Sequence, residues 1–156
     1  MNQTNPASNK YLNKSVLLIS TAVTLVVAVV LGVYVAKHSK TKVVLGDTVV
    51  TVSIADTPEA QMRGLGFQEQ LKLNQGMLFV FADGKPHGFW MKDMRFPIDI
   101  IWFDANRRIV YVKEGAQPAS YPEIFTPSVS TPLVLEVPAG FFSYHRLKVG
   151  DTLKIN

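Results

Sequence analysis

The hydrophobic pattern divides the 156-residue chain into one long apolar segment and a series of much shorter ones. The long segment, residues 16–36 (VLLISTAVTLVVAVVLGVYVA), carries no charged side chain. A helix rises 1.5 Å per residue, so a helix of this length would measure about 32 Å, enough to cross a bilayer core of roughly 30 Å. The pattern therefore predicts a transmembrane helix at residues 16–36.

A cleaved signal peptide is the main alternative for this segment. Its apolar core would be shorter, roughly 7–15 residues, and a small residue would be expected where Tyr34 stands two positions before Ala36. We therefore expect an uncleaved single-pass anchor, preceded by a short polar N-terminus (1–15) and followed by a linker (37–47). A short N-terminus ahead of one anchor favours an extracytoplasmic location for the C-terminal domain.

Short runs typical of β-strands fill the rest of the chain. Residues 48–54 alternate between two faces, whereas 76–81 (GMLFVF) form a continuous apolar run bounded by turn residues, as expected of a buried strand. The sequence DANRR between two further runs predicts a hairpin. The expected strands cover residues 48–54, 76–81, 98–103, 109–112, 133–137 and 152–155.

Two short helices interrupt these strands. Thr57 or Asp56 can cap a helix that begins near Pro58, and Gly64 ends it. A second helical piece is expected between residues 138 and 151. The domain over residues 48–156 is therefore expected to be mainly β (α+β), a compact barrel or sandwich with two short helices.

The net charge of +4 is not spread over the chain. Residues 1–42 contain five lysines and no acid, so they carry +5, and residues 43–156 carry −1. The basic charge flanks the apolar segment and does not form a groove that could follow phosphates. We expect the membrane, reached through the chain's own anchor, to be a partner, and nucleic acid not to be one; the pattern identifies no protein partner.

Several kinds of site are not indicated by the sequence. The chain has no cysteine, which excludes thiolate chemistry and disulfides. His87 and His145 have no second histidine at ligand spacing, and no glycine-rich loop leads from a strand into a helix. We expect no metal and no cofactor, and no residue can be assigned a catalytic role.

Two carboxylates stand among apolar neighbours in predicted strands. Asp99 lies within IDIIWF and Glu136 within LVLEV, so both are expected to be buried and to need a partner. In FWMK, Trp90 and Lys92 share one side, and Arg63 lies in the first short helix. These five residues form the candidate site.

Two interpretations of this group are open. In the first, Lys92, Arg95 or Arg63 neutralises the buried acids and fixes strand register. In the second, the group lines a pocket with Trp90 as its apolar wall, and the pocket binds a polar small molecule or an envelope component. The loop over residues 115–132 would then cover it.

The order and spacing of several motifs resemble one family. ADTPEAQMRGLGF, GMLFVF, GFWMKDMRFPIDIIWFD, VLEVPAG and LKVGD occur as in the prokaryotic family called domain of unknown function 192, over roughly residues 48 to 155. The resemblance implies a small β-rich fold and, in many members, an N-terminal export signal or anchor. It implies no activity, cofactor or catalytic residue.

Three functions are compatible with these observations. The favoured one is a membrane-anchored β-rich domain that acts as a non-enzymatic binding or accessory module of the cell envelope. The second is a hydrolase that uses Asp99 and Glu136 as a carboxylate pair. The third is a structural or interaction module without a pocket.

Overall fold

The computed structural model describes residues 16–30 and 40–155, in two compact units that divide after residue 39. Residues 16–30 are helical and exposed. Among the helices of the described ranges, none is both long and apolar enough to cross a membrane. The predicted N-terminus (1–15), the end of the predicted anchor (31–36) and the start of the linker (37–39) lie outside the described residues.

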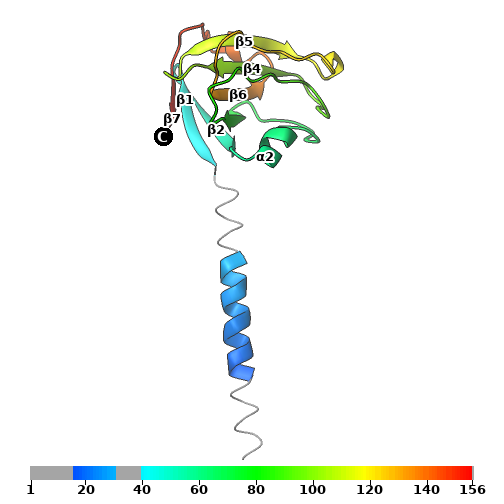
Figure 1. Cartoon of the computed structure of the whole chain (residues 1–156), viewed down its shortest axis with the longest axis vertical. Helices are drawn as coiled ribbons and strands as arrows, with labels where there is room; N and C mark the ends of the chain where they lie inside the picture. The colour runs from blue at the N-terminus through cyan, green and yellow to red at the C-terminus, as the bar shows by residue number, and fades with distance from the viewer. Residues whose placement is uncertain (1–15, 31–39, 156) are drawn as a thin grey trace, which may run out of the picture. The chain divides into compact units, whose positions relative to one another are not determined.

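The second unit is built on one seven-stranded sheet, as Figure 1 shows. Its helices are α2 (Pro58–Arg63) and α3 (Phe141–Tyr144), with a 3-10 turn, η1, at Pro118–Ser120. The strands are β1 (Thr41–Leu45), β2 (Thr48–Ala55), β3 (Gln75–Val80), β4 (Ile98–Phe103), β5 (Ile109–Ala116), β6 (Leu133–Pro138) and β7 (Leu153–Ile155). The mainly β class and the predicted β4–β5 hairpin are confirmed.

The strands follow the order β5-β4-β6-β3-β2-β1-β7. All neighbours are antiparallel except β2 and β3, which run parallel because α2 lies on the connection between them. The two edge strands approach each other at one end, where Arg108 forms an isolated bridge with Thr152. A single curled sheet of this kind is a half-barrel, so the sandwich alternative is wrong.

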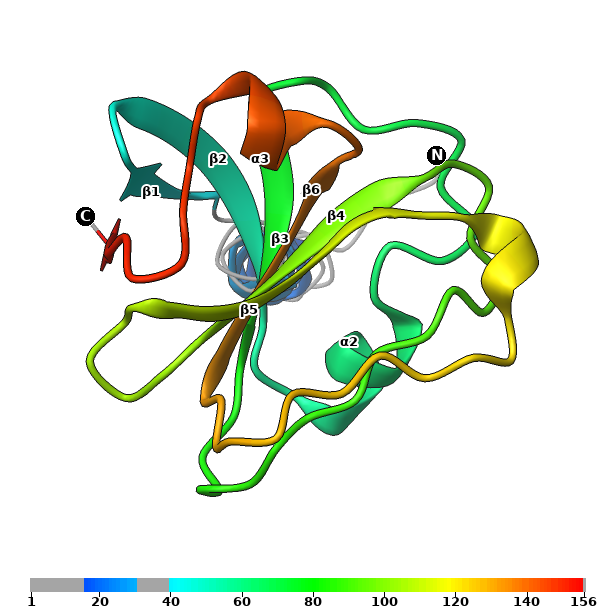
Figure 2. The same ribbon diagram turned by 90° about the horizontal axis from the view of Figure 1, so that it is seen from above.

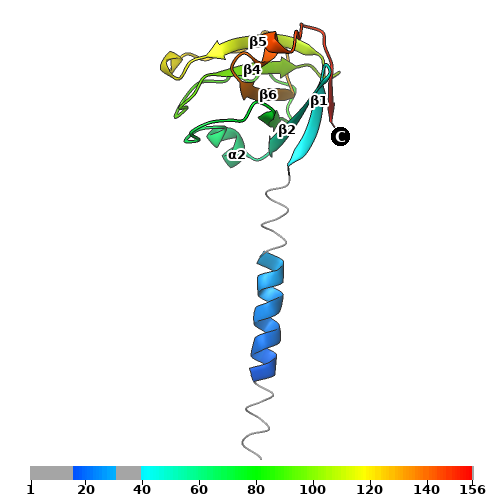
Figure 3. The same ribbon diagram turned by 180° about the vertical axis from the view of Figure 1, so that it is seen from behind.

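The two faces of the sheet carry separate hydrophobic cores. The inner core takes buried residues from all seven strands and from the α3 region, among them Leu45, Phe103 and Phe141. The outer core lies under α2 and the loops that follow β3 and β5, and it includes Phe79 and Trp102. In Figures 1 and 3, α2 lies at one side of the domain and β1 with β7 at the other. Figure 2 shows α2 and α3 well separated around the fan of strands.

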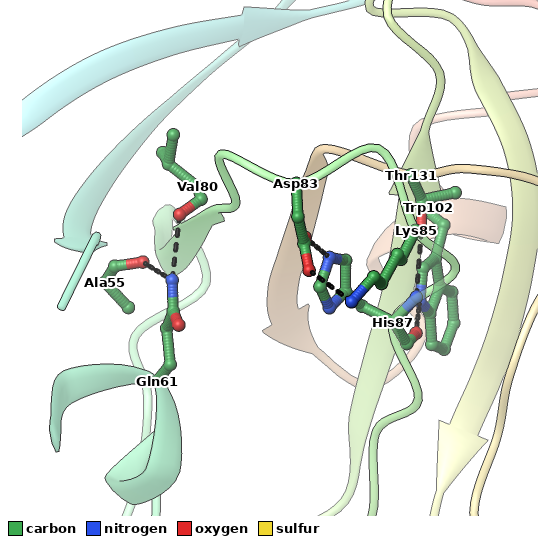
Figure 4. Close-up of polar contacts among 8 residues, drawn as sticks. All are labelled: Ala55, Gln61, Val80, Asp83, Lys85, His87, Trp102 and Thr131. Atoms are coloured by element: carbon green, nitrogen blue, oxygen red, sulfur yellow. Dashed lines mark hydrogen bonds and ion pairs between the residues drawn. The ribbon is translucent and has the colours of Figure 1, made fainter. Parts of the chain in front are cut away.

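Helix α2 begins and ends as its sequence predicts. The Thr57 hydroxyl accepts a hydrogen bond from the Ala60 amide (3.3 Å), Pro58 occupies the first turn, and Gly64 ends the helix at φ +51°. Gln61 fastens the helix to the sheet, since its Nε2 donates to the carbonyl oxygens of Val80 (2.8 Å) and Ala55 (3.4 Å), as Figure 4 shows. The helix is thereby fixed over the outer core.

Strand β1 differs from the sequence prediction, which placed a linker over residues 37–47. Residues 41–45 instead form a strand that pairs with β2 on one side and β7 on the other. Val43 and Leu45 are completely buried in the inner core. The domain therefore begins near residue 40, not at residue 48.

Candidate functional site

A cavity of about 190 Å³ lies at the outer face of the sheet, beside α2. Its walls come from the end of α2 and the turn after it, from the β3 end and the segment that follows, and from one residue of β6. The lining residues are Gln61, Met62, Arg63, Gly64, Leu65, Gly66, Phe79, Phe81, His87, Gly88, Phe89, Trp90, Lys92, Met94 and Glu136. Four of the five predicted site residues are therefore brought together, and Asp99 is not among them.

Glu136 is the only carboxylate among the residues that line the cavity. It lies opposite Met77 of β3 and Ile100 of β4, and its side chain is 4% exposed. Its Oε2 atom is buried and has no hydrogen-bond partner in the described part of the chain. Burial in this apolar setting raises the pKa of Glu136 from 4.5 to about 8, so the carboxyl is mostly protonated at neutral pH.

Gly64, at the end of α2, lies beside this carboxyl. A Cβ at Gly64 would lie 3.8 Å from the Glu136 Oε2 and 3.5 Å from the Phe79 ring. The positive φ of +51° is also a conformation that residues with side chains rarely adopt. The backbone that ends α2 thus requires a glycine directly beside the Glu136 carboxyl.

Arg63 and Lys92 line the same cavity but are exposed, one at the end of α2 and the other after Trp90. Over residues 16–30 and 40–155, the ion pairs are Lys85–Asp83, His87–Asp83 and Arg95–Glu69. Among these residues, no lysine or arginine neutralises Asp99 or Glu136. The interpretation in which a structural ion pair neutralises these acids is therefore wrong, and within the described ranges Arg63 and Lys92 have no acidic partner.

Trp90 and Lys92 lie on the same side of their segment, as the sequence predicted. The flanking residues Phe89 and Met91 are buried, whereas Trp90 is 42% exposed and lines the cavity. The Trp90 ring meets the Tyr121 ring edge to face, with centroids 6.0 Å apart. The 115–132 loop contacts this wall through Tyr121 and through Phe125, which forms a bridge with Phe89. No residue of the loop is among those that line the cavity, so the loop supports the wall and does not form the predicted cover.

Asp99 lies on the other face of the sheet. In the β4–β6 pairing it stands opposite Val137, and Ile100 stands opposite Glu136, so the two acids project to opposite faces. The Asp99 carboxylate accepts hydrogen bonds from the backbone amides of Gly115 (2.8 Å), Gly140 (3.1 Å) and Phe142 (2.9 Å). Its role is structural, and the hydrolase that would use Asp99 and Glu136 as a pair is contradicted.

Sequence reasoning missed the polar pair beside the cavity, which Figure 4 shows. His87 Nε2 lies 2.7 Å from Asp83 Oδ1, and its ring stacks on Phe81 with centroids 3.5 Å apart. Trp102 Nε1 donates to the His87 carbonyl oxygen (2.8 Å) and fixes the backbone there. In the sequence, Asp83 and His87 stand four residues apart in ADGKPH, and this spacing could have indicated the pair.

Across the described ranges, no three acidic, histidine or cysteine side chains gather as a metal site would require.

The comparisons with known proteins agree on one family and one fold. The model of the DUF192 family, described as Uncharacterized ACR, COG1430, matches residues 40–155. The UPF0127 protein TK1120 of Thermococcus kodakarensis is 29% identical over 107 residues, a match that covers 65% of this chain and 62% of that relative's length.

Two crystal structures are similar to the chain. One, from Sinorhizobium meliloti 1021, is described as a candidate transcription regulator; it is 29% identical, with a TM-score of 0.71, over 75% of this chain and 94% of its own. The other is a protein of unknown function from Novosphingobium aromaticivorans DSM 12444, 24% identical with a TM-score of 0.70, over 77% and 96%. The second likeness shows the fold alone.

Proposed function

The chain belongs to the DUF192 family, and from this premise and the geometry of the cavity we propose that its domain binds a small polar molecule beside α2. The observation that carries the proposal is Glu136. A buried carboxyl group without a hydrogen-bond partner is costly, and a molecule in the cavity would provide the missing partner.

The proposal is for binding and not for catalysis. Glu136 has no second carboxylate beside it in the lining of the cavity, so general acid–base work by a carboxylate pair has no partner there. The aromatic and methionine side chains around it, together with a few polar groups, are the composition of a ligand pocket. The third function, a structural or interaction module without a pocket, does not fit a surface that contains this cavity.

Nucleic acid is not the proposed ligand. The Sinorhizobium protein is described as a candidate transcription regulator, but residues 43–156 of this chain carry a net charge of −1. Non-specific binding to nucleic acid depends on neutralising phosphates with a surplus of cations. The two cations at the cavity are too few to follow a phosphate backbone.

A thermal-shift screen of the full chain in detergent tests the binding function. The panel contains sugars, sugar acids, amino acids and nucleosides, and we expect at least one compound to raise the unfolding temperature. Trp90→Ala should remove this response without lowering the unfolding temperature of the free protein, because Trp90 is half exposed. Tyr144→Ala, which removes another exposed aromatic ring away from the cavity, is the matched control and should respond as the wild type does.

We also propose that residues 16–36 anchor the chain as a single-pass membrane protein and that the domain acts in the cell envelope, outside the cytoplasm. The support is the charge-free sequence of this segment and the helical conformation of residues 16–30. The lysines at both ends can contact anionic lipid headgroups.

The absence of native cysteine allows a direct test of the anchor and its orientation. Ser128→Cys places one thiol on an exposed position of the domain. We expect the full chain to stay with membranes after carbonate washing, and a membrane-impermeant maleimide to label this thiol in cells with a permeabilised outer layer. Val26→Arg, at the middle of the segment, should weaken membrane retention. Recovery of the wild-type chain in the carbonate supernatant would contradict the anchor, and labelling only after lysis would contradict the orientation.

A further inference from the structure

The charged side chains that line the cavity lie at different depths, with the acidic group buried and the two cations exposed. This arrangement favours some small polar molecules over others as ligands. Glu136 is 4% exposed and its Oε2 is buried, whereas Arg63 and Lys92 are exposed. All three line the same cavity. Building on the proposed binding function, we infer that the ligand is a small zwitterion of the amino-acid type, with its ammonium group on Glu136 and its anionic group on Arg63 and Lys92.

An ammonium group suits the inner end of the cavity for two reasons. It carries three N–H donors and a positive charge, so it can bond to the unpartnered Oε2 and form an ion pair with the carboxylate, which a hydroxyl group cannot do. The rings of Phe79, Phe81 and Phe89 line the same cavity, and aromatic faces attract cations.

The outer end requires an anionic group on the same molecule. A plain amine would pass two positive side chains, Arg63 and Lys92, and would be repelled by both. A carboxylate or phosphate on the ligand removes this repulsion and gains charge-assisted hydrogen bonds with the same two groups. The cavity volume of about 190 Å³ is below the roughly 300–1,000 Å³ of pockets for drug-sized ligands, which restricts the zwitterion to a small one.

Isothermal titration calorimetry on the full chain in detergent tests the assignment. The probes are the twenty standard L-amino acids, β-alanine, γ-aminobutyrate and phosphoethanolamine. For the tightest binder, the N-acetyl derivative lacks the ammonium charge and the amide derivative of the carboxylate lacks the anion. We expect each derivative to bind at least tenfold more weakly than the parent zwitterion.

Proton release provides a readout that is specific to the ammonium contact. The other titratable groups that line the cavity are Arg63, His87 and Lys92. Because the pKa of Glu136 is about 8, Glu136 is protonated in roughly nine of ten protein molecules at pH 7. Binding of an ammonium group to the ionised form should therefore release close to one proton per ligand. The apparent affinity should be about eightfold tighter at pH 8.5 than at pH 7, since only the ionised form forms the ion pair.

Substitutions separate the two ends of the ligand. Glu136→Gln should weaken zwitterion binding at least tenfold and abolish proton release, whereas Arg63→Gln and Lys92→Gln should weaken binding but leave proton release unchanged. Lys154→Gln, an exposed lysine of β7 outside the cavity, is the control and should bind as the wild type does.

Failure of this assignment is distinguishable from failure of the binding function. If no zwitterion binds, but a sugar or a plain anion stabilises the chain and loses this effect in Trp90→Ala, the zwitterion assignment is overturned and the binding function stands. Zwitterion binding without proton release, or binding retained by Glu136→Gln, also overturns the assignment. If no compound from either set binds, both proposals fail.

Discussion

The two buried carboxylates of this chain are accommodated in opposite ways. Asp99 is completely buried and accepts three backbone hydrogen bonds, so its charge is compensated within the fold. Glu136 is almost as deeply buried, but its Oε2 has no partner among the described residues. A carboxyl group in this situation keeps its proton, and burial raises its pKa to about 8. The stability of the fold should therefore depend on the protonation of this residue, and under the proposed function ligand binding should depend on it too.

This dependence gives a prediction for the pH profile of stability. In the unfolded chain the Glu136 pKa is near 4.5, and in the folded chain it is about 8. Between these values the folded state binds more protons, so the free energy of unfolding falls as the pH rises and levels off above pH 8. The full loss is on the order of 5 kcal/mol.

Glu136→Gln should remove this pH dependence, because the amide stays neutral. We expect the variant to be more stable than the wild type at pH 9 and similar to it at pH 5, in thermal or urea unfolding of both proteins. Glu123→Gln, which neutralises an exposed glutamate, is the control and should keep the wild-type profile. A wild-type chain equally stable at pH 5 and pH 9 would contradict the prediction.

At the level of single residues, burial was predictable from sequence and partners were not. The apolar neighbours of Asp99 and Glu136 predicted that both would be shielded from water, and both are. Their separation depends on the register between β4 and β6, which sets Ile100 and not Asp99 opposite Glu136. A shift by one residue would move every side chain of a strand to the other face. Both strands are buried on both faces, so the alternation of residues within either strand does not reveal that register.

At the level of elements, Asp99 connects three parts of the fold. Its three amide donors belong to Gly115 near the end of β5, to Gly140 before α3, and to Phe142 within α3. These segments are distant in sequence, and the side chain of one β4 residue joins them at the inner face. The ends of β5 and α3 are thereby fixed relative to β4.

Asp99→Asn tests this connection. An amide has one acceptor oxygen where the carboxylate has two, and its NH2 group would face backbone N–H donors. We expect a loss of about 3 kcal/mol or more in the free energy of unfolding, since hydrogen bonds to charged groups contribute roughly 1.5–3 kcal/mol each. Urea unfolding measures the loss, and Asp56→Asn, at an exposed aspartate, should change stability by less than about 0.5 kcal/mol. Equal stability of the two variants would contradict the structural role of Asp99.

Strands were predictable where the sequence marked both of their ends. The DANRR turn identified the β4–β5 hairpin, and NQG and ADGKP bounded β3. β1 was missed because it begins within the lysine-rich residues 37–42, which read as a linker. Its signal was the pair of apolar runs in TKVVLGDTVVTV, separated by Gly46 and Asp47, with Gly46 at a positive φ of +59°. These two residues form the turn of the β1–β2 hairpin.

For the whole domain, closure of the sheet depends on β1. It lies between β2 and β7 and pairs with both, so it joins the C-terminal strand to the rest of the sheet. β7 in turn meets the start of β5, through the Arg108–Thr152 bridge. Without β1, β7 keeps only its backbone contacts at the start of β5 and loses its strand partner. The inner core also loses two completely buried side chains, Val43 and Leu45.

The two possible domain boundaries therefore predict different behaviour of truncated chains. A fragment of residues 40–156 keeps every strand and should unfold in one cooperative transition. A fragment of residues 48–156, which begins where the sequence alone placed the domain, lacks β1 and exposes the edge of β2. Burying each of the two lost side chains contributes roughly 1.5–3 kcal/mol, and all the β1 hydrogen bonds are lost with them, which together approach the 5–15 kcal/mol stability of a typical domain. We expect the shorter fragment to aggregate or to lack a cooperative transition in calorimetry.

Val43→Ala together with Leu45→Ala in the longer fragment should give an intermediate, reduced unfolding temperature. A cooperative transition of the 48–156 fragment at the temperature of the 40–156 fragment would mean that the sheet closes without β1.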